Sequence, residues 1–513
     1  MAHKTLFYIV LCVGLFRTDA IFFSDLSFAE IIKIYAQYYN EATVSDAELS
    51  ETRNIADVVQ QNDNLYKNLT CLIENFLKRY VPSSMPTLAQ NKWWGEGPPY
   101  VDTSIRPYEI RFNRQVIDEL RARLAYRKNF TRNLEGSANT YGMNRNLLNQ
   151  VLDYWLNRYD FETRERYLNR FPQYITNVQG LDIHYIHIVP PPGSKKVIPL
   201  LMIHGWPVTN REYYAVYDFL LEPKNTNFVF EIIAPSIPGY GYSQPTYKIG
   251  LAPYQVGIIF KNLMARLGHQ KFYIHAGDVG LWVGSHMSTI YQEDVLGLHT
   301  TTPYSAMPQT FVKIALGALN PTSLVDSRYV NRLYPLTMTL INLIESSGFF
   351  HMHATRPDTL GVGLEDSPSG LAAWLLAIYI QAANPNALKR DDGNLLQAYN
   401  IDDILDVLTI YWDSHCITTS LRFYAEFTAV LQDPTNIKLE LTPTQVPYGA
   451  LKFRYEVLYQ PDSLLKNKYP NLVHSTTLDF GGHFSSFEYP DVIANSIYQA
   501  VEKMQNFYRT KAG

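Results

Sequence analysis

The chain has 513 residues, 46% of them hydrophobic and 18% charged, which supports a large buried core and excludes a disordered or collagen-like polymer. The 44 Lys and Arg against 48 Asp and Glu give a net charge of −4 with no long basic run, so no nucleic-acid partner is expected. The three cysteines, Cys12, Cys71 and Cys416, form no C-x-x-C pair and are too few for a disulfide framework.

The sequence of residues 1–20 indicates the cellular compartment to which the chain is directed. Residues 6–16 form an apolar run that follows Lys4 and is closed by Arg17. A membrane-spanning helix needs about 20 mostly apolar residues, so a secretory signal sequence is favoured and an uncleaved anchor is the alternative. We therefore expect the endoplasmic reticulum, either in the lumen or with the N-terminus associated with the membrane, and secretion is the alternative.

Two sequons are consistent with this route. Asn68 and Asn129 each begin an Asn-x-Thr pattern, which has meaning only in a chain that enters the secretory pathway. Unmodified surface asparagines are the alternative. If Cys12 leaves with the signal, an oxidising lumen would permit Cys71 and Cys416 to pair without requiring it.

The chain before residue 181 is expected to be largely helical. Residues 21–90 are polar, with helical spacing of apolar positions as far as the prolines at 82 and 86, which indicates a helical extension of unknown role. Residues 91–180 carry apolar side chains every three or four positions, which predicts amphipathic helices that pack on the core and the lid.

From residue 181 the period changes to that of an α/β fold. Residues 181–188 alternate, and 197–203, 228–233 and 272–275 are short apolar runs, as in buried strands. Helical stretches lie between them, which predicts a mostly parallel central sheet flanked by helices. The helical block 306–432 predicts an inserted lid that divides the core into residues 181–305 and 433–513.

A turn at 276–280 carries the candidate nucleophile. Its small residues allow a sharp strand-to-helix turn that presents the side chain of Asp278, as in the nucleophile elbow of the α/β-hydrolase fold. An ionised carboxylate there can open a strained or activated C–O or C–X bond by displacement. For this pentapeptide alone, an Asx turn or a helix cap is the alternative.

Three further segments supply the groups that such a nucleophile needs. The N–H of Trp206, in the turn His-Gly-Trp-Pro at 204–207, and that of Val279 can form an oxyanion hole. His483, in a Gly-Gly-His-Phe turn, offers a general base, and Glu456 offers a carboxylate to orient it. Each could singly be a packing or surface group, but the order nucleophile, acid, histidine is that of the α/β-hydrolase fold.

These motifs are shared with a known family. The chain resembles the microsomal epoxide hydrolases, including the arthropod juvenile hormone epoxide hydrolases, over roughly residues 93–505. The matching stretches are 93–95 (WWG), 104–107 (SIRP), 180–184 (GLDIH), 204–207 (HGWP), 235–241 (PSIPGYG), 356–359 (RPDT), 366–368 (DSP), 422–424 (RFY) and 481–484 (GGHF).

The resemblance implies a two-step hydrolysis of a lipophilic epoxide, either a xenobiotic or a juvenile-hormone-like terpenoid, to a vicinal diol. Asp278 would form an ester with one ring carbon while the lid phenol of Tyr424 protonates the ring oxygen. His483, oriented by Glu456, would then activate water against that ester. The resemblance also implies that Trp206 and Phe349 line the substrate pocket. No metal or organic cofactor is needed, and the oligomeric state is left open.

Two features depart from the family pattern. A second lid tyrosine is usual where this chain has Phe349, and loss of a general acid typically lowers the rate about 10²–10⁴-fold. The elbow has Ala276 and Val279 where Gly and Trp are usual, which keeps the amide but changes the pocket wall. An active epoxide hydrolase is favoured. The alternative is a weakened homologue that binds an apolar ligand without efficient turnover, and a dehalogenase has little support.

Overall fold

The computed structural model describes residues 82, 84–99, 102–193, 195–222, 226–318, 320–430 and 434–512. The predicted signal or anchor at 1–20, most of the extension 21–90, and Asn68 and Cys71 lie outside the described residues. Two compact units divide the chain. The described part of one is 305–348 with 459–467, and the other comprises 84–304, 349–458 and 468–512.

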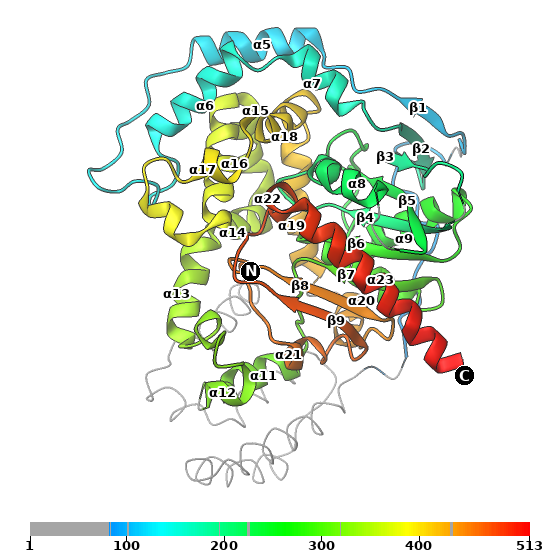
Figure 1. The fold of residues 1–513 in the computed structure, drawn as a ribbon. Coiled ribbons are helices and arrows are strands. Elements are labelled where there is room, and N and C mark those ends of the chain that lie inside the picture. Colours follow the sequence, from blue (N-terminus) through cyan, green and yellow to red (C-terminus); the bar gives the residue numbers. More distant parts are fainter. Residues whose placement is uncertain are drawn as a thin grey trace. The chain divides into compact units, whose positions relative to one another are not determined.

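The larger unit is built on one sheet, in which nine strands are described, in the order β1-β2-β3-β5-β4-β6-β7-β8-β9 (Figure 1). The strands are β1 (Arg106–Tyr108), β2 (Gln173–Val178), β3 (Leu181–Ile188), β4 (Lys196–Ile203), β5 (Phe228–Pro235), β6 (Phe272–Ala276), β7 (Val295–Thr300), β8 (Tyr448–Lys452) and β9 (Leu472–Thr477). Strands β1, β2, β3 and β5 pair antiparallel, and all pairs from β5 through β4 to β9 are parallel. The predicted mostly parallel α/β sheet is confirmed.

The segment 91–180 contains two short strands in addition to helices. It contains α5 (Arg114–Ala125), α6 (Arg145–Asn157) and α7 (Phe161–Leu168), but also β1 and β2. Strand β2 joins β3 through a two-residue turn in which Gln179 and Gly180 both have positive φ, at +54° and +87°. Turns of this kind match the twist of the two strands of a hairpin, so they favour the pairing of β2 with β3. The sequence of β2 alone shows only a weak strand pattern, and the pairing is what makes it a strand.

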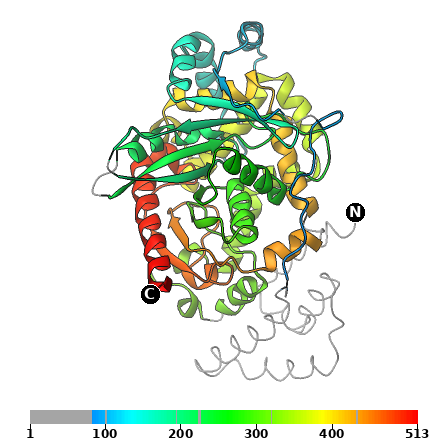
Figure 2. The same ribbon diagram turned by 90° about the vertical axis from the view of Figure 1, so that its right-hand side faces the viewer.

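Helices cover both faces of the sheet (Figure 2). On one face α8 (Tyr214–Leu221) packs against α23 (Pro490–Ala512), and on the other α9 (Pro253–Arg266) packs against α10 (Val279–Ile290). Helices α9 and α10 bury most of their residues, so apolar residues make up most of both stretches.

Between β7 and β8 the chain is helical. In the larger unit this segment forms α14 (Gly348–Thr355), α15 (Pro357–Asp366), α16 (Pro368–Ala383), α17 (Leu395–Ala398), α18 (Ile401–Asp413), α19 (Ile417–Val430) and α20 (Pro434–Leu441). Helix α16 starts at the Ser367 cap and α18 at the Asn400 cap, whose side chains accept backbone N–H bonds. Helices α5 and α6 pack on α16 (Figure 1).

A buried ion cluster ties helix α18 to the core of the same unit. Asp406, which is fully buried, accepts bonds from Arg211 at 2.7 Å and Arg164 at 2.8 Å. The hydroxyl of Tyr159 donates to the same carboxylate at 2.8 Å. The buried charges of Asp406, Arg211 and Arg164 are thus paired and hydrogen-bonded, which offsets the cost of removing them from water.

The smaller unit has its own apolar centre. It contains α11 (Pro308–Gly317), α12 (Pro321–Leu324), α13 (Leu336–Ser346) and α21 (Asp462–Leu465). The buried side chains at its centre are Val325, Leu333, Tyr334, Leu336 and Leu464. Leu464 comes from the returning segment 459–467, so this unit is closed by residues far apart in the sequence.

Within the described ranges, no helix combines the length and the apolar character needed to span a membrane.

Candidate active site

Asp278 sits at a strained turn between β6 and α10. Its φ of +49° and ψ of −129° lie in a region that non-glycine residues rarely occupy. Two glycines permit the turn: a Cβ on Gly205 would lie 2.6 Å from the Asp278 Cβ, and one on Gly280 would lie 2.5 Å from the Ile203 carbonyl oxygen. The Asp278 N–H donates to Thr302 Oγ1 at 2.7 Å. The turn therefore holds the carboxylate in a single direction.

The Asp278 carboxylate has two differently placed oxygens. Oδ1 accepts the backbone N–H of Trp206 at 2.8 Å. Oδ2 lies 3.3 Å from Nε2 of His483, whose Nδ1 lies 2.8 Å from Oε1 of Glu456. Oδ1 is held by the amide and is already where an oxyanion would develop, so Oδ2, the oxygen beside His483, is the one in position to attack.

His483 is held between two carboxylates. Burial alone would lower the pKa of this imidazole, but the charges and hydrogen bonds of Glu456 and Asp278 raise it well above its usual value. Glu456 follows β8, and its Oε1 also accepts the N–H of Val457 at 2.9 Å. The resting site therefore stores a proton on His483, because both neighbouring acids favour the charged ring.

The turn that carries the Trp206 amide is fixed by its own side chains. His204 is fully buried, and burial lowers its pKa to about 4, so the ring is neutral. Its Nε2 accepts the N–H of Ile237 at 3.0 Å. The Trp206 indole N–H donates to Ser420 Oγ on α19 at 3.1 Å. These bonds hold the amide donor in place without any rearrangement during the reaction.

A small cavity beside the carboxylate has room for about one water molecule. Asp278, His483, Thr302 and Glu212 are among its lining residues. Glu212 accepts the N–H of Gly205 and the hydroxyl of Ser486, each at 3.0 Å, and burial raises its pKa to about 7. The cavity is thus a water-sized space that touches both the candidate nucleophile, Asp278, and the candidate base, His483.

Aromatic rings of the inserted helices cover the Trp206 turn. Tyr424 on α19 packs edge-on to Trp206 with centroids 5.7 Å apart, and Phe349 on α14 lies parallel to the indole. Burial and the Asp278 charge raise the pKa of Tyr424 well above its usual value, so the phenol keeps its proton. Within the described residues, no hydrogen bond contributes to this shift in the pKa of Tyr424, so the phenol is offered to a substrate oxygen.

His353, one helical turn after Phe349, completes this cover. Its ring lies 4.5 Å from Trp206 and 5.0 Å from Tyr424 between centroids. Burial lowers its pKa to about 3, and its Nε2 accepts the indole N–H of Trp374 at 3.1 Å. His353 is therefore a neutral ring inside the aromatic cover of the site.

The structure places the predicted residues in one region of the larger unit. Asp278, His483, Glu456, Trp206 and Tyr424 make the contacts given above, and Val279 is fully buried at the start of α10. Sequence reasoning missed Thr302, Glu212, Ser420 and the position of His353. Only His353 had a usable signal, since its spacing of four from Phe349 puts both on one face of a helix.

A positioned carboxylate at a strand-to-helix turn, an amide donor and a histidine–carboxylate pair define an α/β-hydrolase-fold protein with aspartate at the nucleophile position. Comparison with known proteins narrows the class. Residues 105–213 match the family model for the epoxide hydrolase N terminus. The juvenile hormone epoxide hydrolase of Manduca sexta is 45% identical over 86% of this chain and 95% of its own length.

Further relatives agree. Epoxide hydrolase 1 of Sus scrofa is 37% identical over 79% of this chain and 91% of its own length. The crystal structure of juvenile hormone epoxide hydrolase from the silkworm Bombyx mori superposes with a TM-score of 0.79 at 39% identity, covering 82% of this chain and all of that one. The chain belongs to the epoxide hydrolase family, as the motifs predict.

Proposed function

We propose that this chain hydrolyses a lipophilic epoxide to a vicinal diol through an ester on Asp278. One observation carries the proposal: Oδ2 of Asp278 lies 3.3 Å from the His483 imidazole, which is itself held by Glu456 at 2.8 Å. A carboxylate nucleophile alone would be consumed by its first epoxide. The adjacent histidine supplies the base that can release it.

In the first step Oδ2 of Asp278 bonds to a ring carbon as that carbon's bond to the ring oxygen breaks. The negative charge moves to the former ring oxygen, which takes the proton of the Tyr424 phenol. Trp206 and Phe349 are the proposed apolar walls around the substrate, since they stack beside Tyr424. An apolar, buried cover suits a lipophilic substrate.

The second step follows from the charge balance of the site. Ester formation removes the Asp278 charge, one of the two that raise the pKa of His483, so the imidazole becomes able to give up its stored proton. It then takes a proton from water in the adjacent cavity, and the hydroxide attacks the ester carbon. The N–H groups of Trp206 and Val279 stabilise the oxyanion before the diol leaves. The stored proton of His483 re-forms the Tyr424 phenol, and the proton taken from water restores the imidazolium. The remaining proton of that water passes from the attacking hydroxyl to the leaving oxygen, so the Asp278 carboxylate is regenerated.

The decisive experiment is a single turnover in oxygen-18 water. Attack of labelled water on the ester puts the label in the Asp278 carboxylate, where peptide mass spectrometry detects it. Diol formation without label in that peptide would overturn the ester mechanism. Stoichiometric binding of the epoxide without diol would instead support the alternative that Phe349 motivates, a weakened homologue that binds an apolar ligand.

The substrate class is a terpenoid or xenobiotic epoxide. Relatives that bear the name juvenile hormone epoxide hydrolase and relatives that bear the name epoxide hydrolase 1 are both similar to this chain. A competition between a juvenile hormone epoxide and an aryl epoxide, read as the ratio of kcat/KM, decides between the hormone-like and the xenobiotic role.

We also propose entry into the secretory pathway, with residence in the endoplasmic reticulum as a membrane-associated or lumenal glycoprotein. The support is the apolar run at 6–16 together with Asn129, which is exposed in the loop between α5 and α6. Expression with and without Asn129→Gln, followed by endoglycosidase treatment, should show one fewer mobility step in the variant. An endoglycosidase-insensitive wild type recovered in the cytosol would contradict the proposal.

A further inference from the structure

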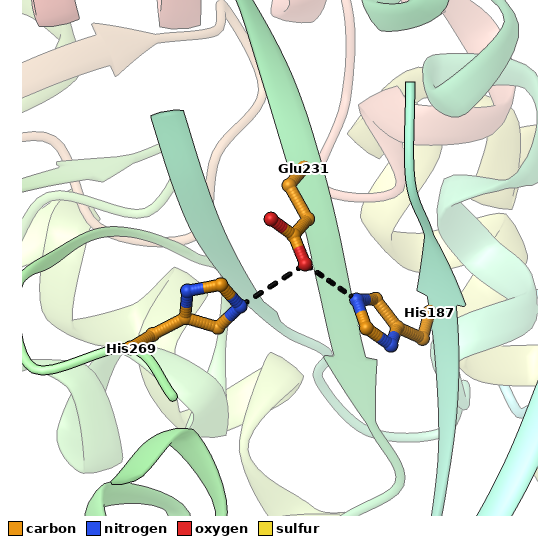
Figure 3. Close-up of side chains that lie close together, drawn as sticks. All are labelled: His187, Glu231 and His269. Atoms are coloured by element: carbon orange, nitrogen blue, oxygen red, sulfur yellow. Dashed lines mark hydrogen bonds and ion pairs between the residues drawn. The ribbon is translucent and has the colours of Figure 1, made fainter. Parts of the chain in front are cut away.

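Three metal-ligating side chains converge away from the catalytic residues (Figure 3). The Nε2 atoms of His187 and His269 lie 2.7 Å and 3.1 Å from the same oxygen, Oε1 of Glu231. One ligand atom from each residue lies within 4.8 Å of the others. In the close-up the carboxylate stands between the two imidazoles, with both rings turned toward it.

Regular structure fixes two of these side chains. His187 lies on β3 and Glu231 on β5, which pair antiparallel with His187 opposite Ile233. Residues two apart on a strand share a face, so His187 and Glu231 are diagonal neighbours on one side of the sheet. Their spacing is therefore set by the strand register.

The third is fixed by the end of helix α9. Gly268 has a φ of +87°, its N–H donates to the Ala265 carbonyl, and the N–H of His269 donates to the Met264 carbonyl. This pattern is a Schellman motif, with glycine at the left-handed position and His269 directly after it. The backbone that presents His269 is thus ordered before any ligand arrives.

We propose that His187, Glu231 and His269 bind a borderline divalent cation, Zn²⁺ in the first place, at a site separate from the catalytic centre. Two imidazoles and one carboxylate are a ligand set that Zn²⁺ accepts, with a fourth position for water. Zn²⁺ holds such ligands at about 2.0–2.2 Å, so its ligand atoms lie roughly 3–4 Å apart. Replacing the two hydrogen bonds by metal bonds therefore needs only small side-chain shifts.

Exposure and position fit an ion that enters from solvent. The side chains of His187, Glu231 and His269 are 18%, 16% and 15% exposed, which shields the ligands but leaves an entry path. His269 precedes β6 and Asp278 follows it, so the length of this strand separates the two sites. The ion would join β3, β5 and the α9–β6 turn and stabilise the folded chain by mass action.

The experiment is calorimetric titration of the full chain with Zn²⁺, with His269→Gln and Glu231→Gln as test variants. His415→Asn is the matched control, because His415 is exposed and outside the cluster. We expect one Zn²⁺ per chain in the wild type and control, and affinity lowered about tenfold or more in each test variant. Turnover of an epoxide should be unchanged in all of them when Zn²⁺ is removed by a chelator.

A second readout does not depend on the variants folding. Cu²⁺ added to the wild type in equimolar amount should show hyperfine coupling to two imidazole nitrogens in its electron paramagnetic resonance spectrum. Binding of Zn²⁺ that is unchanged in both test variants, no Zn²⁺ binding by the wild type, or Cu²⁺ bound by a single imidazole would each overturn the proposal.

Discussion

Phe349 lies parallel to the indole of Trp206, with ring centroids 5.7 Å apart and planes 10° apart. The centroid of the Tyr424 ring, whose hydroxyl we propose as the proton donor, lies 6.3 Å from that of Phe349. An apolar ring therefore stands beside the phenol where a second hydroxyl could assist it. Under the proposed mechanism, opening of the epoxide ring therefore depends on one tyrosine, Tyr424, because a phenylalanine ring has no proton to donate.

A tyrosine at position 349 should accelerate ring opening. Phe349→Tyr adds only a hydroxyl to a half-buried ring, so packing should be kept and a second hydrogen bond to the ring oxygen gained. We expect the rate of ester formation to rise by about 10-fold or more, as measured in single-turnover kinetics. Phe350→Tyr serves as the control on the neighbouring position. Equal rates for Phe349→Tyr and wild type would show that the missing phenol does not limit this chain.

Removing the remaining phenol should be far more costly. Tyr424→Phe is expected to lower the rate of ester formation about 10²–10⁴-fold, because the alkoxide loses its donor. Tyr379→Phe, on α16, is the matched control, since its buried hydroxyl has no hydrogen-bond partner within the described chain. A rate for Tyr424→Phe that is close to that of this control would remove Tyr424 from the mechanism.

The pKa of His483 should depend on Asp278. The raised pKa arises from two carboxylates acting against burial, so Asp278→Asn is expected to move it downward, as ester formation would. NMR titration of the imidazole measures the change. In the folded wild type the proton is bound more tightly than in the unfolded chain. That contribution to stability is therefore present below the unfolded pKa and lost as pH rises through the folded one. An unchanged titration in the variant would contradict the charge-release step.

Glu456 should matter for release of the ester more than for its formation. Glu456→Gln keeps the shape but removes the charge that orients His483, so hydrolysis is expected to slow by as much as ~10⁴-fold while attack by Asp278 changes little. Rapid mixing should then show a burst of covalent adduct, visible as a mass increase on the Asp278 peptide. Equal slowing of both steps would indicate a structural role for this acid.

The ion cluster around Asp406 should carry stability. Asp406→Ala removes the buried carboxylate between Arg211 and Arg164 and leaves both charges only the half-buried Asp403, which we expect to lower the free energy of unfolding by about 3–5 kcal/mol. Asp358→Ala, which breaks an ion pair with Arg422 in which Asp358 is 66% exposed, should cost at most about 1 kcal/mol. Chemical denaturation of both variants checks the contrast, and similar losses would refute it.

Much of the sheet could be predicted because its strands carry strong local patterns. Strands β3, β4, β5 and β6 are apolar or alternating and lie close to the predicted bounds. Strand β1 has only three residues, and β2 is ordered by its pairing with β3. The local sequence of each is therefore not enough to predict a strand. The unit closed by Leu464 was not expected, because a contact between residues over a hundred positions apart leaves no periodicity to detect.

The site could be predicted where chemistry is tied to a turn motif. Asp278, Trp206 and His483 each lie in a short glycine-containing sequence that a sharp turn requires. Glu212 and Thr302 do not, and they accept the backbone N–H groups of Gly205 and Asp278 only because β4, β6 and β7 lie side by side. Residues that join the site only through the arrangement of the strands cannot be predicted from the sequence until the strand order is known.

In the sequence, the helical segment between β7 and β8 separates the attacking carboxylate and the oxyanion-hole amides from the base and the carboxylate that orients it. Asp278 and the Trp206 and Val279 amides precede it, whereas Glu456 and His483 follow it. The lifetime of the covalent adduct is therefore governed by a stretch of chain that does not contain the residue forming it. Changes near the C-terminus can convert a catalyst into a trap for its own substrate and leave the capture step intact.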